Sequence, residues 1–199
     1  MIRNGIVATA FALGLVLSTS SGAYAAPVTE PADPSDEVVT LPMEFVGFDE
    51  EVANANGFEI VTATDGTQSS VPVTEEAKRI QAEADARAAA DGEVGARGVA
   101  YGNCGTSWVW AEKFSGDLLS VDTGYDLYMD VYARNWSLVI SSSWSGGGVY
   151  SWPVQPTSAY WDITWYGTVV GWGNVYAAGS TTLLNGATCY SNNPADSFP

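Results

Sequence analysis

Histidine is missing from this 199-residue chain, and basic residues are few, since seven Lys and Arg stand against 23 Asp and Glu. Without histidine the chain cannot build a Ser-His-Asp or Cys-His catalytic arrangement or an HExxH zinc site. The sequence also contains no GxSxG motif and no phosphate-binding P-loop. The formal net charge of −16 disfavours nucleic acid as a partner. We therefore expect no catalytic residue of these kinds, no cofactor and no metal.

A second absence is that of any apolar run long enough to span a bilayer. The apolar stretch at residues 6–17 follows Arg3 and precedes the small-x-small sequence Ala23-Tyr24-Ala25. This order is typical of a secretory signal peptide, which we predict at residues 1–25. An uncleaved anchor helix is the alternative, and the short run without a basic stop-transfer flank argues against it. We expect a secreted, extracellular protein with no membrane insertion after signal cleavage.

Cysteine is limited to Cys104 and Cys189, which lie 85 residues apart in the sequence. In an oxidising compartment two cysteines pair, so export predicts a disulfide between them. Closing a loop of this length stabilises a domain by about 4–5 kcal/mol in the chain-entropy description. We expect the bond to tie the first strand of a domain to its last. A redox site would favour a CxxC spacing, and a zinc site would need further Cys or His ligands.

Composition divides the rest of the chain into two parts. Residues 26–97 hold 16 Asp and Glu against four Lys and Arg, and they lack Trp, Tyr and Cys. Residues 98–199 hold all eight Trp, nine of the ten Tyr and both Cys. The first part has too few large apolar groups to form a core of its own. We predict an acidic linker or pro-region at 26–97 and a disulfide-closed β domain at 98–199.

Local order is expected at two places in the acidic part. Residues 58–73 contain two β-prone runs around Asp65-Gly66, which is a hairpin signal. Residues 75–90 are typical of a helix with Thr74 as its N-cap. Because Ile80 is the one large apolar residue of that helix, we interpret the helix as a solvated spacer.

The remainder of the acidic part is predicted to lack fixed structure. Residues 26–42 are rich in Pro and acids, which favours an extended tether, and we expect residues 26–57 as a whole to be disordered. Cleavage at Arg97 would make the acidic part a removable pro-region, and a plain linker is the alternative.

The last hundred residues alternate apolar and polar side chains with the period of β-strands. About seven short runs are separated by turn signals, among them Thr123-Gly124 and Asn185-Gly186. The sequence predicts an all-β fold, an antiparallel β-sandwich, with a small β-barrel as the alternative. Lys113 is expected to face solvent. The side chains expected to face the core are Trp108, Trp110, Phe114, Tyr125, Leu127, Met129, Val131, Trp136, Leu138, Ile140, Trp144, Trp161, Ile163, Trp165 and Val169.

Carboxylates leave one route to catalysis, because a pair of acids can hydrolyse glycosides. Glu112 is the only Glu of the β domain, and Asp162 is a candidate partner for it. Asp122, Asp126 and Asp130 would share one face of a strand that runs unbroken. Such a row could bind Ca²⁺, but a solvated face that blocks edge pairing is the favoured interpretation.

The excess of aromatic residues is the positive indication of function. Exposed aromatic rings beside acids stack on sugar rings or anchor protein partners, and cross-strand ladders that stabilise a sheet are the alternative. The aromatics expected to lie outside are Tyr128, Tyr132, Tyr160, Tyr166, Trp152 and Trp172. From them and their acidic neighbours we predict a ligand-binding surface that consists of Tyr128, Tyr132, Trp172, Asp126 and Asp130.

The stretch YGNCGTSWV at residues 101–109, with a signal peptide, an acidic stretch and a late cysteine around it, resembles uncharacterised small secreted proteins of Gram-positive bacteria. The resemblance covers roughly the last half of the chain and carries no assigned activity. We expect a secreted, non-enzymatic β domain that binds a neutral extracellular ligand, either a neutral polysaccharide or an extracellular protein. The alternatives are a polysaccharide hydrolase with a carboxylate pair and an effector or inhibitor released from its acidic segment.

Overall fold

The computed structural model describes residues 38–90, 104–152 and 158–199. The signal peptide predicted at 1–25 and the cleavage site considered at Arg97 lie outside these ranges. In chain order the elements are β1 (Val39–Pro42), β2 (Glu44–Phe48), α1 (Glu50–Ala55), β3 (Phe58–Thr62), β4 (Gln68–Pro72), α2 (Glu75–Ala90), β5 (Gly105–Lys113), β6 (Leu118–Leu127), β7 (Val131–Ser142), β8 (Gly146–Trp152), β9 (Tyr160–Thr168), β10 (Gly173–Leu183), β11 (Ala187–Tyr190) and β12 (Ala195–Phe198).

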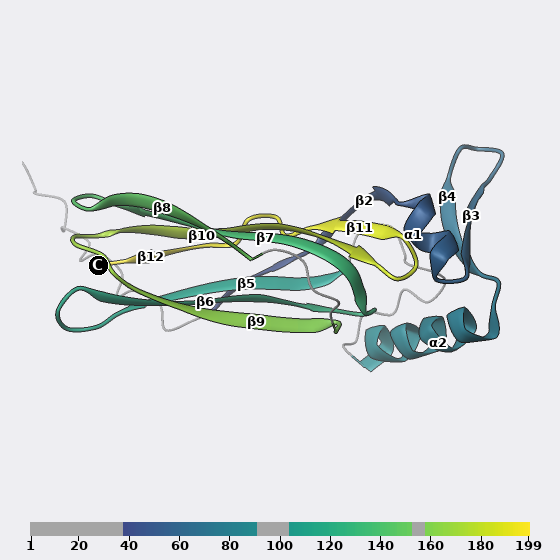
Figure 1. Cartoon of the computed structure of the whole chain (residues 1–199), viewed down its shortest axis with the longest axis horizontal. Coiled ribbons are helices and arrows are strands. Elements are labelled where there is room, and N and C mark those ends of the chain that lie inside the picture. The colour runs from purple at the N-terminus through teal and green to yellow at the C-terminus, as the bar shows by residue number, and fades with distance from the viewer. Residues whose placement is uncertain (1–37, 91–103, 153–157) are drawn as a thin grey trace, which may run out of the picture. The chain divides into compact units, whose positions relative to one another are not determined.

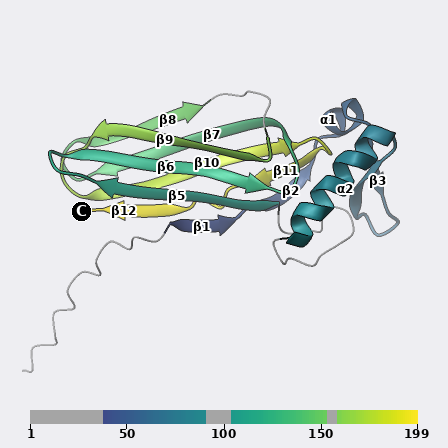
Figure 2. The same ribbon diagram turned by 90° about the horizontal axis from the view of Figure 1, so that it is seen from below.

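Two antiparallel sheets lie one over the other, as Figures 1 and 2 show. One sheet has four strands in the order β1-β5-β6-β9. The other has six, in the order β2-β11-β10-β7-β8 with β12 paired to β10. Each sheet has open edges, so the prediction of an antiparallel β-sandwich is confirmed and the barrel alternative is not formed. Within the described ranges, neither helix has the length and apolar content needed to cross a bilayer.

The space between the two sheets holds the core. Tyr125, Leu127, Met129 and Val131 are all buried, as their alternation predicts. Trp136 of β7 is completely buried, and its indole Nε1 donates a hydrogen bond to Thr123 Oγ1 on the opposite sheet at 3.1 Å. Two further aromatic contacts join the sheets, with ring centroids 5.6 Å apart for Tyr125–Trp136 and 5.9 Å apart for Trp136–Trp161. Within the four-stranded sheet, the rings of Tyr125 and Trp161 are 5.7 Å apart.

The orientation predicted for β5 is wrong. Its buried positions are Ser107 and Val109, while Trp108 and Trp110 are half-buried on the opposite face of the strand. Two polar contacts accompany this orientation. The Ser107 hydroxyl donates to the Ser191 carbonyl at 2.7 Å, and Lys113, expected outside, donates from Nζ to the Gly171 carbonyl at 2.7 Å.

Three further predictions about the strands are corrected. Trp144, expected in the core, is 80% exposed because it lies in the turn between β7 and β8. Phe114, also expected inside, follows the end of β5 and is exposed. Thr123-Gly124, expected to form a turn, lies inside β6. Asn185-Gly186 does form the turn between β10 and β11, with Gly186 at φ +84°.

The disulfide between Cys104 and Cys189 is confirmed. Cys104 directly precedes β5, and Cys189 lies in β11 of the other sheet. The bond therefore links the two layers of the sandwich. It does not join the first strand to the last, because β1 and β2 come before it and β12 comes after it.

The acidic part is more ordered than its composition predicts. The expected disorder is wrong for residues 39–57, which form β1, β2 and α1. β1 pairs with β5 at one edge of the four-stranded sheet, and β2 pairs with β11 at one edge of the six-stranded sheet. Met43, between the two strands, is fully buried, and its backbone exchanges hydrogen bonds with Cys104 and Gly105. The segment has no core of its own, but it is ordered because its strands join the sheets of the β domain and bury side chains in the core of that domain.

The predicted hairpin and helix are both present. β3 and β4 pair around a turn with Gly66 at φ +87°. Helix α2 spans the predicted residues, and the Thr74 hydroxyl accepts a hydrogen bond from the Ala77 amide at 3.1 Å, as expected for an N-cap. The interpretation of α2 as a fully solvated spacer is wrong, because Ala77 and Ala84 are buried. Small residues let the helix approach the domain without a large apolar face.

Candidate functional site

The five residues predicted to bind a ligand do not form one surface. Tyr128 and Asp130 lie in the connection between β6 and β7, next to α2. Tyr132 is exposed on β7, in the six-stranded sheet. Trp172 is exposed in the turn where the chain crosses from β9 to β10. Asp126 lies on β6, in the four-stranded sheet.

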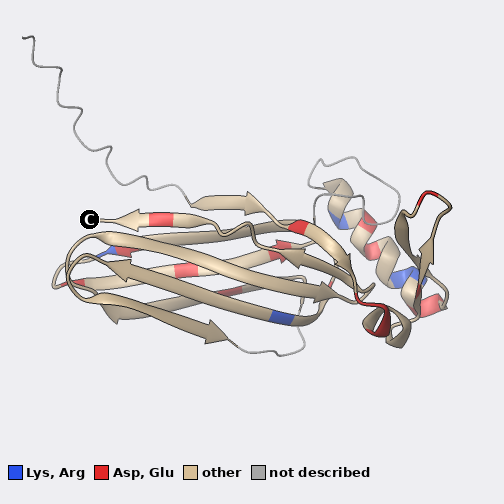
Figure 3. Cartoon of the chain, turned by 90° about the horizontal axis from the view of Figure 1, so that it is seen from above, with Lys and Arg blue, Asp and Glu red and all other residues tan. Residues whose placement is uncertain are grey.

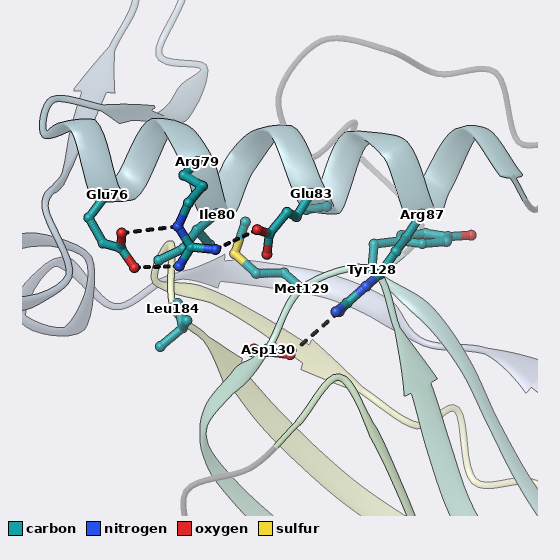
Figure 4. Close-up of a pocket in the computed structure, with 10 residues that line it drawn as sticks. Glu76, Arg79, Ile80, Glu83, Arg87, Tyr128, Met129, Asp130 and Leu184 are labelled. Carbon is teal, nitrogen blue, oxygen red and sulfur yellow. Dashed lines mark hydrogen bonds and ion pairs between the residues drawn. The ribbon is translucent and has the colours of Figure 1, made fainter.

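Tyr128 and Asp130 line a pocket of about 220 Å³ between α2 and the domain. Figure 4 shows the side chains that α2 directs toward it. Arg79 pairs with Glu76 and with Glu83 on the same helix. The apolar part of the lining comes from Ile80, Ala84, Met129 and Leu184.

Asp130 has a structural role in this region. Its Oδ1 accepts a hydrogen bond from the backbone amide of Ala159 at 2.9 Å and lies 3.4 Å from Nη1 of Arg87. Its carbonyl accepts from the Leu184 amide at 3.1 Å. The pocket is therefore the contact region through which α2 docks. The pair Arg87–Asp130 crosses it, whereas Arg79 pairs with acids of its own helix.

A different group of aromatic residues does come together, on the outer surface of the four-stranded sheet. The register places Trp108 of β5 beside Gly124 of β6, and Gly124 beside Asp162 of β9. We call this outer surface the aromatic face. Its residues are Thr40 and Pro42 of β1, Thr106, Trp108, Trp110 and Glu112 of β5, Leu118, Ser120, Asp122, Gly124 and Asp126 of β6, and Tyr160, Asp162, Thr164, Tyr166 and Thr168 of β9.

Trp108 and Tyr160 form the centre of the aromatic face. Their ring centroids are 5.6 Å apart, with an angle of 31° between the ring planes. The Trp108 ring lies over Gly124, since a Cβ at that glycine would stand 2.6 Å from ring atom Cζ2. A glycine inside a strand often marks such a close approach. The two rings together give a stacking surface that spans three strands.

Acids surround this pair of rings. Asp126 is the register partner of Tyr160, and Asp162 is a diagonal neighbour of both Asp122 and Asp126, at a typical Cα separation of about 7–8 Å. The Thr164 hydroxyl donates a hydrogen bond to the Asp122 carboxylate. The pKa of the Tyr160 hydroxyl is raised, chiefly by partial burial and to a smaller extent by the negative charges of Asp162, Asp126 and Asp122, which disfavour the phenolate. No residue of the aromatic face is basic.

Basic groups of the sandwich point elsewhere. Figure 3 shows few blue positions on the sheets, whereas α2 carries both colours. Lys113 is directed to the Gly171 carbonyl and to Asp117, whose Oδ1 is 3.3 Å from Nζ. Arg134 is buried, with its guanidinium 3.8 Å from the centre of the Trp161 ring. Within residues 38–90, 104–152 and 158–199, the aromatic face thus carries four acids and no Lys or Arg.

The carboxylate pair considered for hydrolysis is widely separated. Glu112 stands in the row of Ser120 and Tyr166, and Asp162 stands in the row of Gly124. The two rows are four residues apart, which is about 13 Å along the strands. In addition, the strand β6 lies between β5, which carries Glu112, and β9, which carries Asp162. Glycosidase carboxyl groups lie about 5–9.5 Å apart. Among the described residues, no group of three or more acids or cysteines is arranged to hold a metal ion.

Sequence reasoning placed Tyr160 and Tyr166 outside, and both are exposed, at 52% and 64%. It missed Trp108 and Trp110, because large apolar residues were assigned to the core. The signal that could have found them is Gly124, a residue without a side chain in the middle of a strand. Of the predicted ligand-binding residues, the aromatic face contains Asp126 alone.

Comparison with models of protein families, with curated proteins and with solved structures finds no match. Function is therefore inferred from the aromatic face itself.

Proposed function

We propose that this protein is a secreted, non-enzymatic module that binds an extracellular polysaccharide on the aromatic face. The observation that carries the proposal is the contact between Trp108 and Tyr160 over Gly124. Sugar rings have apolar faces that stack on flat aromatic rings, while their hydroxyls need polar partners at the side. The aromatic face offers both, because Asp122, Asp162 and Thr164 flank the rings.

The extent of the surface favours a polymer over a single sugar. Tyr166 lies six residues from Tyr160 along β9, which corresponds to about 20 Å of strand. Trp110 lies two residues beyond Trp108 on β5. Aromatic groups are thus distributed along the strands rather than gathered at one point, as an extended ligand requires.

Secretion remains part of the proposal. The disulfide supports it, because such bonds persist in oxidising compartments. The acidic charge of the chain argues against anionic polymers as ligands. The resemblance of residues 101–109 to small secreted proteins of Gram-positive bacteria is in keeping with the same location.

The proposal is tested by a glycan array followed by titration calorimetry on the full exported chain. Replacement of Trp108 or Tyr160 by Ala is expected to weaken binding at least about fivefold, which is the effect of losing an interface residue that matters. Tyr132→Ala and Trp172→Ala are the matched controls, since both rings are exposed but lie outside the aromatic face. Far-UV circular dichroism verifies that each variant is folded. Equal loss of binding in test and control variants, or binding to no glycan, would contradict the proposal.

A further inference from the structure

Three turns at one end of the sandwich form an exposed surface that the proposed glycan binding does not use. They connect β5 to β6 (residues 114–117), β7 to β8 (residues 143–145) and β9 to β10 (residues 169–172). Figure 1 shows the strand connections at this end of the two sheets. We call the three turns the tip.

Large apolar side chains are exposed on the tip. Trp144 is 80% exposed and Trp172 is 64% exposed, and Phe114 and Val170 are exposed as well. The Trp144 ring contacts the backbone of Gly171, where an added Cβ would stand 2.3 Å from ring atom Cδ1. The exposed apolar area is on the order of 500 Å², since a large aromatic side chain contributes about 150–250 Å². A patch of this size on a soluble domain marks an interaction site.

Hydrogen bonds between the turns fix their arrangement. The Val169 amide donates to the Asp117 carbonyl at 2.8 Å, which joins the third turn to the first. The Ser143 amide donates to the Trp172 carbonyl at 2.9 Å, which joins the second turn to the third. The exposed rings are therefore held by connected turns, although they come from different parts of the chain.

The carbonyl groups of the third turn have partners within the protein. Those of residues 170–172 accept hydrogen bonds from Ser142 Oγ, Lys113 Nζ and the Ser143 amide. A polar group that leaves water without such a partner costs free energy, and in lipid that cost is largest. These internal hydrogen bonds make the third turn suited to surroundings that offer fewer partners than water does.

The tip carries no net charge. Asp117 is the one charged residue of its three turns, and its Oδ1 lies 3.3 Å from Nζ of Lys113 at the end of β5. The chain as a whole has a formal net charge of −16. An anionic surface therefore repels the protein, whereas a zwitterionic surface does not.

We infer that the tip attaches the protein to the surface of a bilayer of zwitterionic phospholipids. Tryptophan is enriched at the headgroup level of membranes, because its ring is apolar and its N–H needs a polar partner. Trp144 and Trp172 enter that level from two connected turns, while the sheets stay in water. The inference adds a second function to the proposed glycan binding and uses no residue of the aromatic face.

A second copy of the chain, or another protein, fits the tip less well than a lipid surface does. A stable protein interface buries about 800 Å² on each partner. The apolar area of the tip is about 500 Å². A lipid surface needs no complementary shape, and a few anchoring side chains are enough for reversible attachment.

The inference is tested by flotation of the full exported chain with phosphatidylcholine vesicles. The double variant Trp144→Ala, Trp172→Ala should lower the partition coefficient at least about tenfold, because two large apolar side chains no longer leave water. Binding of the parent should persist in high salt, since it does not depend on charge. The matched control is Tyr132→Ala, Tyr190→Ala, because both rings are exposed outside the tip. Far-UV circular dichroism verifies that each variant is folded.

Fluorescence locates the contact. Phosphatidylcholine with bromine atoms at the upper end of its acyl chains should quench tryptophan emission of the parent. The double variant should lose this quenching, because its remaining tryptophans lie outside the tip. Quenching that persists in the double variant would show that another part of the protein meets the lipid, and it would overturn the inference.

Other results overturn the inference in distinguishable ways. If glycans bind and phosphatidylcholine vesicles do not, the lipid attachment is wrong and the proposed function stands. If vesicles bind only when they contain anionic lipid, or if the control variant loses as much binding as the tip variant, the tip is not the anchor. If vesicles do not bind and the parent forms a dimer that the double variant lacks in analytical ultracentrifugation, the tip pairs with a second copy of the chain.

Discussion

The ring of Trp108 lies 5.6 Å from the ring of Tyr160, although the strand β6 runs between the strands that carry them. The contact is made across Gly124, which leaves the space that a side chain would fill. The aromatic face therefore depends on a residue that contributes no side chain to it.

Substituting that glycine is expected to disturb both the sheet and the rings. In Gly124→Ala the new Cβ would stand 2.3 Å from the Trp161 carbonyl oxygen and 2.6 Å from the Trp108 ring. Overpacking of this kind costs about 1–3 kcal/mol. Urea denaturation should show that decrease in the free energy of unfolding, and glycan binding should weaken as well. A variant as stable as the parent, with unchanged near-UV circular dichroism, would show that Trp108 does not lie over β6.

The acidic segment is expected to be part of the folded domain. Met43→Ala removes a fully buried side chain next to the disulfide and should lower the free energy of unfolding by about 2–5 kcal/mol. Val46→Ala is the matched control, because Val46 is exposed on β2, and its effect should stay within about 0.5 kcal/mol. If both substitutions are neutral in urea denaturation, the segment is a tether after all.

Loss of the disulfide is expected to destabilise the sandwich without changing its fold. The bond closes a loop of 85 residues, which corresponds to about 4–5 kcal/mol in the chain-entropy description. The variant with both Cys104 and Cys189 replaced by Ala should unfold at a correspondingly lower urea concentration. Mass spectrometry of the parent under non-reducing conditions should detect no free thiol, and detection of two would contradict the bond.

Arg87 of α2 and Asp130 form an ion pair, and we expect Asp130 to contribute more than Arg87 to the free energy of unfolding. Arg87→Ala is expected to change the free energy of unfolding by less than about 1 kcal/mol, because the pair is half exposed. Asp130→Ala should cost more, about 1–3 kcal/mol, because it also leaves the amide of the buried Ala159 without its acceptor. Equal effects of the two substitutions would show that this amide contact is not formed in solution.

The Tyr160 hydroxyl is expected to ionise above the usual tyrosine range, because burial and the neighbouring acids raise its pKa. Between the pKa of the unfolded chain, about 10, and the higher pKa of the folded protein, the folded protein keeps the proton of this hydroxyl and the unfolded chain has lost it. The contribution of Tyr160 to the stability of the fold therefore decreases as the pH rises through this range. Asp162→Asn should move the transition back toward the usual value. Ultraviolet absorbance of the phenolate, with Tyr160→Phe to assign the signal, measures the shift. A transition that Asp162→Asn leaves unchanged would show that this carboxylate does not act on the hydroxyl.

Sequence periodicity predicted the class of fold well, because alternation is a local property. The alternating residues Tyr125, Leu127, Met129 and Val131, which are all buried, illustrate this. The disulfide could be predicted for a different reason, because the chain has only two cysteines. Periodicity cannot decide which of two alternating sets faces inward when both contain apolar residues. In β5 the set with the larger side chains, Trp108 and Trp110, was predicted to face the core, but it lies on the outer surface of the sheet.

The position of the candidate site depends on contacts between distant strands, which local patterns do not report. Nothing near Trp108 in the sequence reveals that Gly124 and Tyr160 lie beside it. The same holds for β1 and β2, whose short stretches acquire burial only from strands more than sixty residues later. Tyr128 and Asp130 were singled out by alternation within an unbroken strand, but β6 ends at Leu127.

The split of the acidic segment between the two sheets has a consequence for the time course of folding. β2 is made early in synthesis, yet Phe48 pairs with Ala187, so that strand has no partner until nearly all of the chain is available. Folds dominated by such long-range pairings form slowly, in milliseconds to seconds, because the chain loses loop entropy before the contacts compensate for it. The edge strand β2 therefore stays unpaired through most of the synthesis of the chain, and the six-stranded sheet is completed only when residues 187–190 are available.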